Sequence, residues 1–478
     1  MRTRLHLRRT LPGLAAAMLA LASAGAGAQA DAPVHILVPP SEPMPARPER
    51  SQAAIVTLSQ AFEAALAYDA QYRGARFERD STQANVPITR AALLPSLTLS
   101  ASETSSTGQR SFPNAVGQQV TVELDYRAPQ QQLQLRTPLF NYEALQRFRQ
   151  AQRQSEAADA IFRVRAAELI DRLGAAYLQR LLADENLTLI SAQLRVLEGQ
   201  MQRAEQRLQR GEGTRIEVAD VASQLEVARA RLLDVRDQVQ VARRSLLRIT
   251  GIDAAQVAQV PAGFAPPPLF PAGLDEWIEL ALSRSAILQA RAQQVEVARA
   301  GVERSKAGHL PRVDAVASLA RSSNDSVSNL GQGNKLASVG VQLSLPLFSG
   351  FGVEASVMQS RSELSRAQAE LANEREGVRL EVERSYLAVQ TGRARIDALT
   401  LSLRALELSL EGQQRGLAAG VRTVADVLDA QSRVFSAQRD LVQARLDYLL
   451  ARTRLQLQSG ATGAEVVADI DGLLRPRS

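Results

Sequence analysis

The sequence predicts a mainly α-helical protein with membrane-inserted β-strands, built from two copies of one unit. Three observations support this fold class. Only 4% of the 478 residues are aromatic, and Ala, Leu, Arg, Gln and Glu dominate, a composition typical of long helices and coiled coils. The same sequence signals recur in the same order in both halves of the chain. Each half also contains two stretches with the two-residue alternation of half-buried strands.

Residues 1–30 are predicted to be a secretory signal peptide. Four arginines precede an apolar stretch at 11–22, and Ala28-Gln29-Ala30 forms a small-x-small cleavage site. The apolar stretch is shorter than the ~20 residues that a membrane-spanning helix needs, which disfavours a membrane anchor. Because the segment has no acidic residue, its removal lowers the formal net charge from +6 to +2. The basic balance therefore does not indicate a nucleic-acid partner.

Two proline-rich stretches separate the repeated units. Residues 31–57 are predicted to be an extended leader without a core, and residues 252–273 a linker. Repeat 1 then covers residues 58–251, repeat 2 covers residues 274–460, and residues 461–478 form a C-terminal tail. The repeats match at an offset of 216 in their first part and 209 in their last part. Matching pairs include Leu58 and Leu274, Leu94 and Leu310, Tyr177 and Tyr386, and Gly251 and Gly460.

Each repeat is predicted to contain a helix, two strands, a long helix and a further helix. In repeat 1, a helix over 58–92 precedes alternating stretches at 97–102 and 120–126, with a turn-rich stretch over 107–117 between them. Repeat 2 repeats this pattern, with a turn-rich stretch over 324–335. Strands with one apolar and one polar face are also typical of membrane barrels.

The long helices are predicted to form coiled coils. Residues 140–210 contain no proline and would extend about 107 Å at 1.5 Å per residue, more than one globular core requires. Apolar residues from Ile190 to Leu208 step by four and three residues, the spacing of a coiled-coil seam. Residues 58–92 and 214–250 together match the length of the long helix. We expect these two helices to stack end to end beside it.

Four strands cannot close a membrane barrel by themselves. Unpaired N–H and C=O groups at the two sheet edges would each cost several kcal/mol in lipid, and the smallest single-chain barrels have eight strands. The chain is therefore predicted to share a barrel with other copies of itself. These physical arguments permit a dimer, a trimer or a larger ring.

Specific residues resemble one known family. The duplicated unit, the Pro-Leu-Phe segments at 138–140 and 346–348, and Gly-Val-Arg-Thr-Val-Ala-Asp-Val-Leu-Asp-Ala at 420–430 resemble the TolC-like outer membrane efflux and type I secretion channels. The resemblance covers about residues 58–460. It implies a trimer, with a 12-stranded outer membrane β-barrel continued by a long α-helical tunnel in the periplasm of a Gram-negative bacterium.

The resemblance also implies a gate at the periplasmic end of the tunnel. Asp426 and Asp429 would form two acidic rings there, because their spacing places both carboxylates on one helix face. Glu217 and Asp220 occupy the equivalent positions in repeat 1. Such rings attract cations and repel anions. Without the motif, acidic residues three apart would be interpreted as a solvated helix face.

Other gate residues follow the family pattern only in part. Arg422 matches an arginine that links neighbouring coiled coils in the closed state. Leu417 stands where a tyrosine is expected, and Ile216 replaces a hydroxyl residue. The links that close this gate are therefore predicted to differ from the common pattern.

The resemblance implies a passive duct with protein partners. It would dock through a periplasmic adaptor (membrane fusion) protein on an inner-membrane transporter, either an ABC transporter or a proton-driven one. The cargo would be a secreted polypeptide, as in type I secretion, or alternatively small toxic molecules, as in multidrug efflux. The absence of cysteine excludes the lipid anchor of one drug-efflux subgroup, and secretion is the favoured interpretation. A periplasmic adaptor is a rival identity, which the two strand pairs disfavour.

No motif indicates catalysis or a bound cofactor. His309 lies at a predicted helix–strand junction, where a surface histidine is more common than a metal ligand. Residues 331–335 lack the spacing of a phosphate-binding loop. The sequence therefore predicts a protein that is not an enzyme and carries no cofactor or metal.

Overall fold

The computed structural model describes residues 51–475, except residues 262, 327 and 328. The predicted signal peptide and most of the predicted leader therefore lie outside the described residues. None of the helices in the described part of the chain combines the length and the apolar composition needed to cross a membrane.

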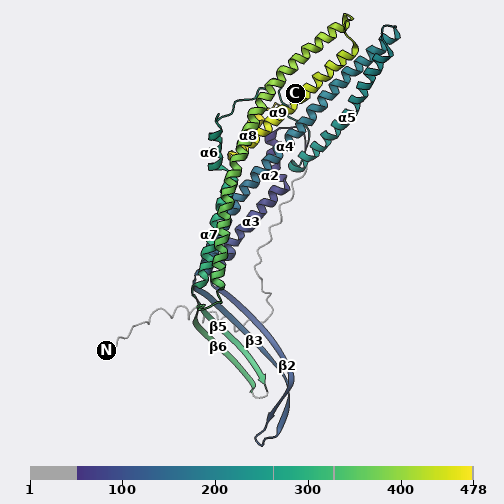
Figure 1. Ribbon diagram of the computed structural model, residues 1–478. Helices are drawn as coiled ribbons and strands as arrows, with labels where there is room; N and C mark the ends of the chain where they lie inside the picture. The colour runs from purple at the N-terminus through teal and green to yellow at the C-terminus, as the bar shows by residue number, and fades with distance from the viewer. Residues whose placement is uncertain (1–50, 262, 327–328, 476–478) are drawn as a thin grey trace. The chain divides into compact units, whose positions relative to one another are not determined.

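The two halves of the described chain contain the same order of elements (Figure 1). The first half contains α2 (Leu58–Tyr68), α3 (Ala70–Ala91), β2 (Ser96–Pro113), β3 (Gln119–Asn141), α4 (Tyr142–Gln209) and α5 (Arg215–Thr250). The second contains α6 (Leu274–Arg284), α7 (Ala286–Lys306), the 3-10 helix η1 (Ala307–His309), β5 (Arg312–Ser326), β6 (Asn329–Ser344), α8 (Gly352–Ala418) and α9 (Val424–Gln458). Three further elements are β1 (Ser51–Val56), β4 (Ile252–Val257) and α10 (Gly463–Leu473).

The first helix of each half is broken into two, where a single helix over 58–92 was expected. Asp69 has an extended backbone and its carboxylate accepts a hydrogen bond from the Tyr72 N–H at 2.7 Å, which starts α3. Arg172 on α4 holds the same carboxylate at 3.2 Å. Ser285 separates α6 from α7 at the equivalent position of the second half. Short polar side chains that bond to nearby backbone favour such caps over a helix interior.

The strands extend through the stretches that were expected to be turns. The β2–β3 ladder runs from the pair Ser96 and Arg136 to the pair Pro113 and Gln119. The turn is confined to the few residues after Pro113, where the Asn114 side chain accepts the backbone N–H of Gln118 at 2.9 Å. The predicted turn over 107–117 is therefore wrong for most of its length. The β5–β6 ladder likewise continues into the second predicted turn.

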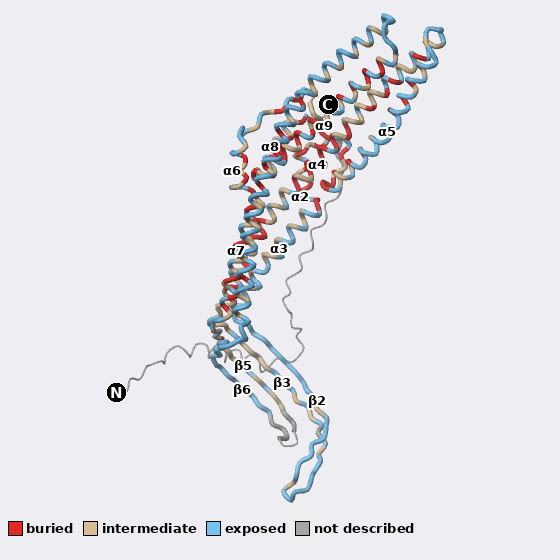
Figure 2. Tube along the Cα trace, viewed as in Figure 1, coloured by how far each residue is buried: buried red, intermediate tan, exposed pale blue. Residues whose placement is uncertain are grey.

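The four long strands form one antiparallel sheet in the order β2-β3-β5-β6. Strand alternation gives the part of this sheet near the helices one apolar and one polar face. The apolar face carries Leu97, Leu99, Leu133, Leu135, Leu319, Val339, Val341 and Leu343. Six of these side chains are exposed, Leu99 at 73% and Val339 at 80%, whereas Leu133 and Leu135 on the inner strand β3 are half-buried (Figure 2). An apolar face without a covering layer is the pattern of a membrane-inserted sheet.

The helices pack along two long partners. Helices α3 and α5 both contact α4, and α2 contacts α5, so the shorter helices follow one another along α4. Helices α6, α7 and α9 contact α8 in the same way, while α4 also contacts α7 and α9 and thereby joins the halves. The expected stacking of two short helices beside one long helix is present in both halves.

In each half, one tyrosine of the long helix hydrogen-bonds to the backbone just before the first helix of that half. The Tyr177 hydroxyl donates to the Val56 carbonyl at 2.8 Å and accepts from the Ala258 N–H at 3.1 Å. The Tyr386 hydroxyl donates to the Ala272 carbonyl at 2.7 Å. Val56 and Ala272 are related by the same offset that connects the first parts of the two repeats in the sequence. The duplication therefore extends to individual hydrogen bonds.

Segments expected to lack a core contribute to it. Strand β1, placed in the leader by the sequence, pairs in parallel with β4, placed in the linker. Val56 and Val257 are 2% and 1% exposed. In the expected C-terminal tail, α10 brings Asp471 to the start of α2, where its carboxylate accepts the Leu58 and Ser59 N–H groups at 3.0 and 3.1 Å. These partners are far away in the chain, which explains why local patterns missed them.

Glycines with positive φ end the helices at equivalent positions of the two halves. Gly251 and Gly460 have φ of 73° and 83°. A Cβ at Gly251 would overlap the Tyr68 ring, and one at Gly460 would lie 2.7 Å from the Arg284 carbonyl oxygen. Tyr68 and Arg284 are themselves equivalent positions of the two repeats. Close backbone approach therefore requires glycine at both sites.

We expect Gly460→Ala to destabilise the protein more than Gly420→Ala. Gly420 has a φ of 77°, but a Cβ there would meet open space. Its replacement should cost about 1 kcal/mol for the positive φ. At Gly460 the clash with Arg284 backbone should add about 1–3 kcal/mol. The midpoint of thermal loss of helical circular dichroism, measured in detergent, tests this. Equal midpoints for the two variants would contradict the packing described here.

Candidate functional site at the tips of the coiled coils

The residues predicted to form a gate lie at two helix–helix turns, the tip between α4 and α5 and the tip between α8 and α9 (Figure 1). Each tip has the same construction. A glycine with positive φ, Gly211 or Gly420, follows the long helix. A threonine, Thr214 or Thr423, then caps the next helix. Glycine and threonine are favoured at these two positions because they tolerate the backbone turn and accept a free helical N–H.

Asp426 is engaged by the start of its own helix. Its carboxylate accepts the Thr423 backbone N–H and the Thr423 hydroxyl, both at 2.9 Å, while the Asp426 N–H donates to the Thr423 hydroxyl at 3.2 Å. This is a capping box. The hydrogen bonds from Thr423, with a smaller effect of Arg422, lower the pKa of Asp426 below its ordinary value. Asp426 is therefore ionised at neutral pH.

Asp429 lies one turn further along α9 and is exposed. Its carboxylate forms an ion pair with Arg433 at 2.7 Å, and both side chains are more than 60% exposed. An exposed pair at this helical spacing contributes about 0.3–0.5 kcal/mol. The structure thus places both predicted aspartates in the first turns of α9, but gives them different partners.

The tip of the first half differs in one respect. Thr214 accepts the Glu217 N–H at 3.2 Å, as Thr423 does for Asp426. The reciprocal bond from the acidic side chain, present at Asp426, is not part of this cap. Asp220 is exposed on the next turn. The four acidic residues therefore occupy equivalent places, and only Asp426 completes a capping box.

Arg422 precedes α9 and lies over the end of α8. A Cβ at Gly416 would be 2.6 Å from the Arg422 Cγ, so the glycine makes room for the arginine stem. Within the described part of the chain the Arg422 guanidinium has no ion-pair partner. Ile216, which replaces an expected hydroxyl residue, is 73% exposed, and Leu417 is half-buried.

A partly buried polar contact that the sequence did not predict joins the two coiled coils. The Gln200 amide on α4 donates to the Gln431 side-chain oxygen on α9 at 2.7 Å. Leu428 on α9 packs beside it in a cluster with Val221 and Leu225 of α5. Gln431, a polar residue among the apolar residues of its coiled-coil seam, is the sequence feature that could have indicated this contact. This contact holds α9 against the first coiled coil two residues beyond Asp429.

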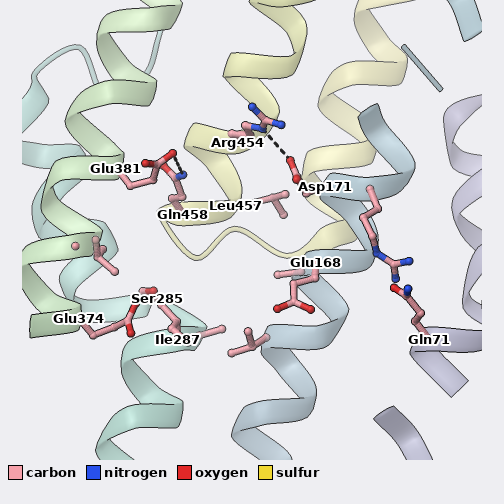
Figure 3. A pocket seen from close by; sticks show the side chains of 16 residues that line it. Gln71, Glu168, Asp171, Ser285, Ile287, Glu374, Glu381, Arg454, Leu457 and Gln458 are labelled. Carbon is pink, nitrogen blue, oxygen red and sulfur yellow. Dashed lines mark hydrogen bonds and ion pairs between the residues drawn. The ribbon is translucent and has the colours of Figure 1, made fainter. Parts of the chain in front are cut away.

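A cavity with a volume of about 640 Å³ lies away from the tips, between α4, α7, α8 and α9 (Figure 3). Its carboxylates are paired: Asp171 with Arg454 at 3.1 Å, and Glu381 with the Gln458 amide at 3.4 Å. Across residues 51–475, apart from the three gaps, no group of three or more His, Asp or Glu could hold a metal ion. Neighbouring side chains thus engage these carboxylates of the cavity.

Comparisons with known proteins agree with the geometry. The model of the outer membrane efflux protein family matches residues 61–252 and 277–461. The proteases secretion protein PrtF of Dickeya chrysanthemi is 32% identical over 357 residues, which cover 72% of this chain and 75% of PrtF. The alkaline protease secretion protein AprF of Pseudomonas aeruginosa is 31% identical over 355 residues, 74% of each chain.

Solved structures share the fold. The outer-membrane channel OprN superposes with a TM-score of 0.70 at 19% identity, covering 85% of this chain and 90% of OprN. CusC superposes with a TM-score of 0.71 at 18% identity, covering 88% of this chain and 99% of CusC. The predicted fold class, a helical tunnel joined to an outer membrane barrel, is confirmed.

If the acidic residues border a pore, Asp426→Asn and Asp429→Asn should each weaken the block of ion current by an added divalent cation several-fold. Both changes remove a charge, and the amide introduced by Asp426→Asn would retain an oxygen for the cap.

Two alanine variants test the gate further. Asp426→Ala should also lower helix stability by about 1 kcal/mol through loss of the cap, and Arg422→Ala should change the conductance. Single-channel recordings in planar bilayers test this, with Glu376→Gln on α8 as the control. Unchanged recordings for both Arg422→Ala and Asp426→Ala would contradict the gate assignment.

Proposed function

The chain belongs to the outer membrane efflux protein family, and we propose that three copies form a gated duct for type I protein secretion. The protein is an outer membrane channel component whose helices lie in the periplasm. The observation that carries the proposed assembly is the four-stranded sheet with an exposed apolar face and two unpaired edges in the described chain.

The sheet edges support a ring of three copies. Strands β3 and β5 have neighbours on both sides, whereas β2 and β6 have one each. In hydrocarbon, the free edge groups need partners. Pairing β6 of one copy with β2 of the next satisfies them without altering the sheet. Three copies then supply 12 strands, with the apolar face toward lipid and the polar face toward the lumen.

The helices support the same arrangement. Helix α8 exposes a stripe of leucines separated by multiples of seven residues, which is the spacing of a coiled-coil seam. Its members are Leu380, Leu387, Leu401 and Leu408, each more than 50% exposed. On the opposite side of the bundle, α5 exposes Leu233 and Val241 at 61% and 68%. In a closed ring, the α8 stripe of one copy would pack against α5 of the next.

The relatives support protein as the cargo. PrtF and AprF are both named protease secretion proteins, and each aligns over about three quarters of its length. An outer membrane efflux protein, BepC of Brucella suis, is also similar, at 26% identity over 217 residues. Small-molecule efflux is therefore the alternative function. In either case a periplasmic adaptor and an inner-membrane transporter, an ABC transporter for secretion, would supply docking and energy.

The gate belongs to the proposal as well. Asp426 and Asp429, with Glu217 and Asp220, would line the periplasmic opening, where three copies bring twelve carboxylates together. The exposed guanidinium of Arg422, which is unpaired within the described chain, supports a link to a neighbouring coiled coil. Release of such links by the adaptor would open the duct.

Charge on the α8 stripe should prevent assembly. Leu401→Glu or Leu408→Glu would remove about 1.5–3 kcal/mol of apolar burial per copy and would bury a carboxylate at the proposed interface. We expect heat-resistant trimers to disappear from outer membrane fractions on unheated gels. Ser409→Glu, an exposed change beside the stripe on α8, is the control. Trimers that persist in both leucine variants would contradict this interface.

Deletion of the gene should distinguish the two cargoes. For a secretion duct, at least one protein should disappear from the culture medium and accumulate in cells, while drug susceptibility stays the same. Proteomics of the medium and minimal inhibitory concentrations measure these effects, with the wild-type gene restored as the control. Unchanged secretion combined with increased drug susceptibility would favour the alternative function.

A further inference from the structure

One of the two β-hairpins is much longer than the other. Pairing between β3 and β5 ends at Gln130 and Ser322, but β2 and β3 remain paired up to Pro113 and Gln119. We name residues 103–129 the distal hairpin; in Figure 1 it extends beyond β5 and β6. Strand β5 continues only to Ser326. The distal hairpin therefore extends about seven residues further per strand, or ~24 Å.

The apolar side chains change faces along this hairpin. Near the helices, the apolar face carries Leu97 and Leu99, and the opposite face carries polar residues such as Thr98 and Gln134. In the distal hairpin, the face continuous with Thr98 and Gln134 becomes apolar along β3 and at the end of β2. Its apolar members are Phe112, Val120, Val122 and Tyr126, while the rest of β2 contributes Thr104, Ser106, Gly108 and Arg110 to the same face. The ladder has no register shift between Ser96 and Pro113, so the reversal lies in the sequence and not in a bulge.

The other face of the distal hairpin is polar. It carries Ser111 and Thr121, whose hydroxyls hydrogen-bond across the strands at 2.7 Å, together with Glu123 and Asp125. This face continues from the one that contacts lipid in the proposed barrel. Beyond the membrane it meets water, which explains its composition. The apolar face of the distal hairpin continues the lumen side of the proposed barrel, and contact with water does not explain its composition. In a single copy its Phe112 and Val120 are 39% and 36% exposed.

We propose that the distal hairpins of three copies contact one another through this apolar face, above the extracellular mouth of the barrel. The inference rests on the trimer proposed above. The occupant of each face is the same face on the other two copies, because all three lie on the lumen side of one ring. Lipid is excluded as the occupant, since it borders the opposite face.

The dimensions permit this contact. Twelve strands about 4.8 Å apart and tilted by about 40° give a backbone circumference of ~75 Å and a radius of ~12 Å. The distal hairpin extends ~24 Å beyond β5, so it can reach the axis. Of the two hairpins in the described sheet only one is long, so three hairpins meet there instead of six. Arg110 shares the apolar face and is exposed, and its long side chain can reach water beside the contact.

The absence of cysteine from the chain makes the proposal testable by single-cysteine variants. Val120→Cys places a thiol on the apolar face of the distal hairpin. Thr121→Cys, at the next residue, places one on the polar face. After mild oxidation of purified trimers, we expect at least five-fold more disulfide-linked dimer with Val120→Cys. Phe112→Cys and Ser111→Cys form a second matched pair on the opposite strand.

The outcomes separate this inference from the proposed function. Unheated gels of each variant first establish whether trimers form. If neither the wild type nor any variant forms trimers, the proposed function is wrong. If trimers form but apolar-face and polar-face cysteines cross-link equally or not at all, only the contact between hairpins is wrong. Cross-linking of Val120→Cys to an exported protein, in place of another copy, would also overturn it.

Discussion

The requirement that buried backbone groups be paired determines most of this architecture. A sheet in hydrocarbon cannot leave N–H and C=O groups without partners, because no water is present to replace them. Strands β3 and β5 meet this requirement within one chain, whereas β2 and β6 meet it on one side only. Helices α3, α4 and α8 and the short η1 adjoin the strand ends within a few residues. In the proposed ring, the arrangement of the strands would therefore be imposed on the helices as well, which would account for the exposed leucine stripe of α8.

The sequence predicted the features that depend on repetition and periodicity. The offsets between matching residues, 216 in the first part of the repeats and 209 in the last part, identified the duplication, and the structure reproduces it in the bonds of Tyr177 and Tyr386. Features that depend on distant partners were missed. Strand β1 forms because β4, which follows only after the whole first repeat, pairs with it. The length of β2 was underestimated because serines and threonines in a paired hairpin resemble those of a turn.

The sequence placed Asp426 and Asp429 on one face of a helix, and the structure places both in the first turns of α9. Their role in a gate stays a prediction. Local geometry assigns Asp426 a structural role, because Thr423 and Asp426 satisfy each other's backbone N–H groups. The spacing of a threonine and an acidic residue three positions later could have indicated this. A carboxylate held in this way is fixed in direction, as the proposed gate would require.

Strand β4 also determines where the described chain enters and leaves its fold. Ser51 pairs with Ile252 at one end of β4, and Arg475 pairs with Gln259 shortly after its other end. Helix α5 separates this strand from the first tip by 36 residues, or ~54 Å, and α2 and α3 separate it from the sheet by a similar length. Both ends of the described chain therefore emerge at the waist of the helical region. A reporter domain or purification tag joined directly at Ser51 or Arg475 would therefore lie beside the helices, away from both the tips and the sheet.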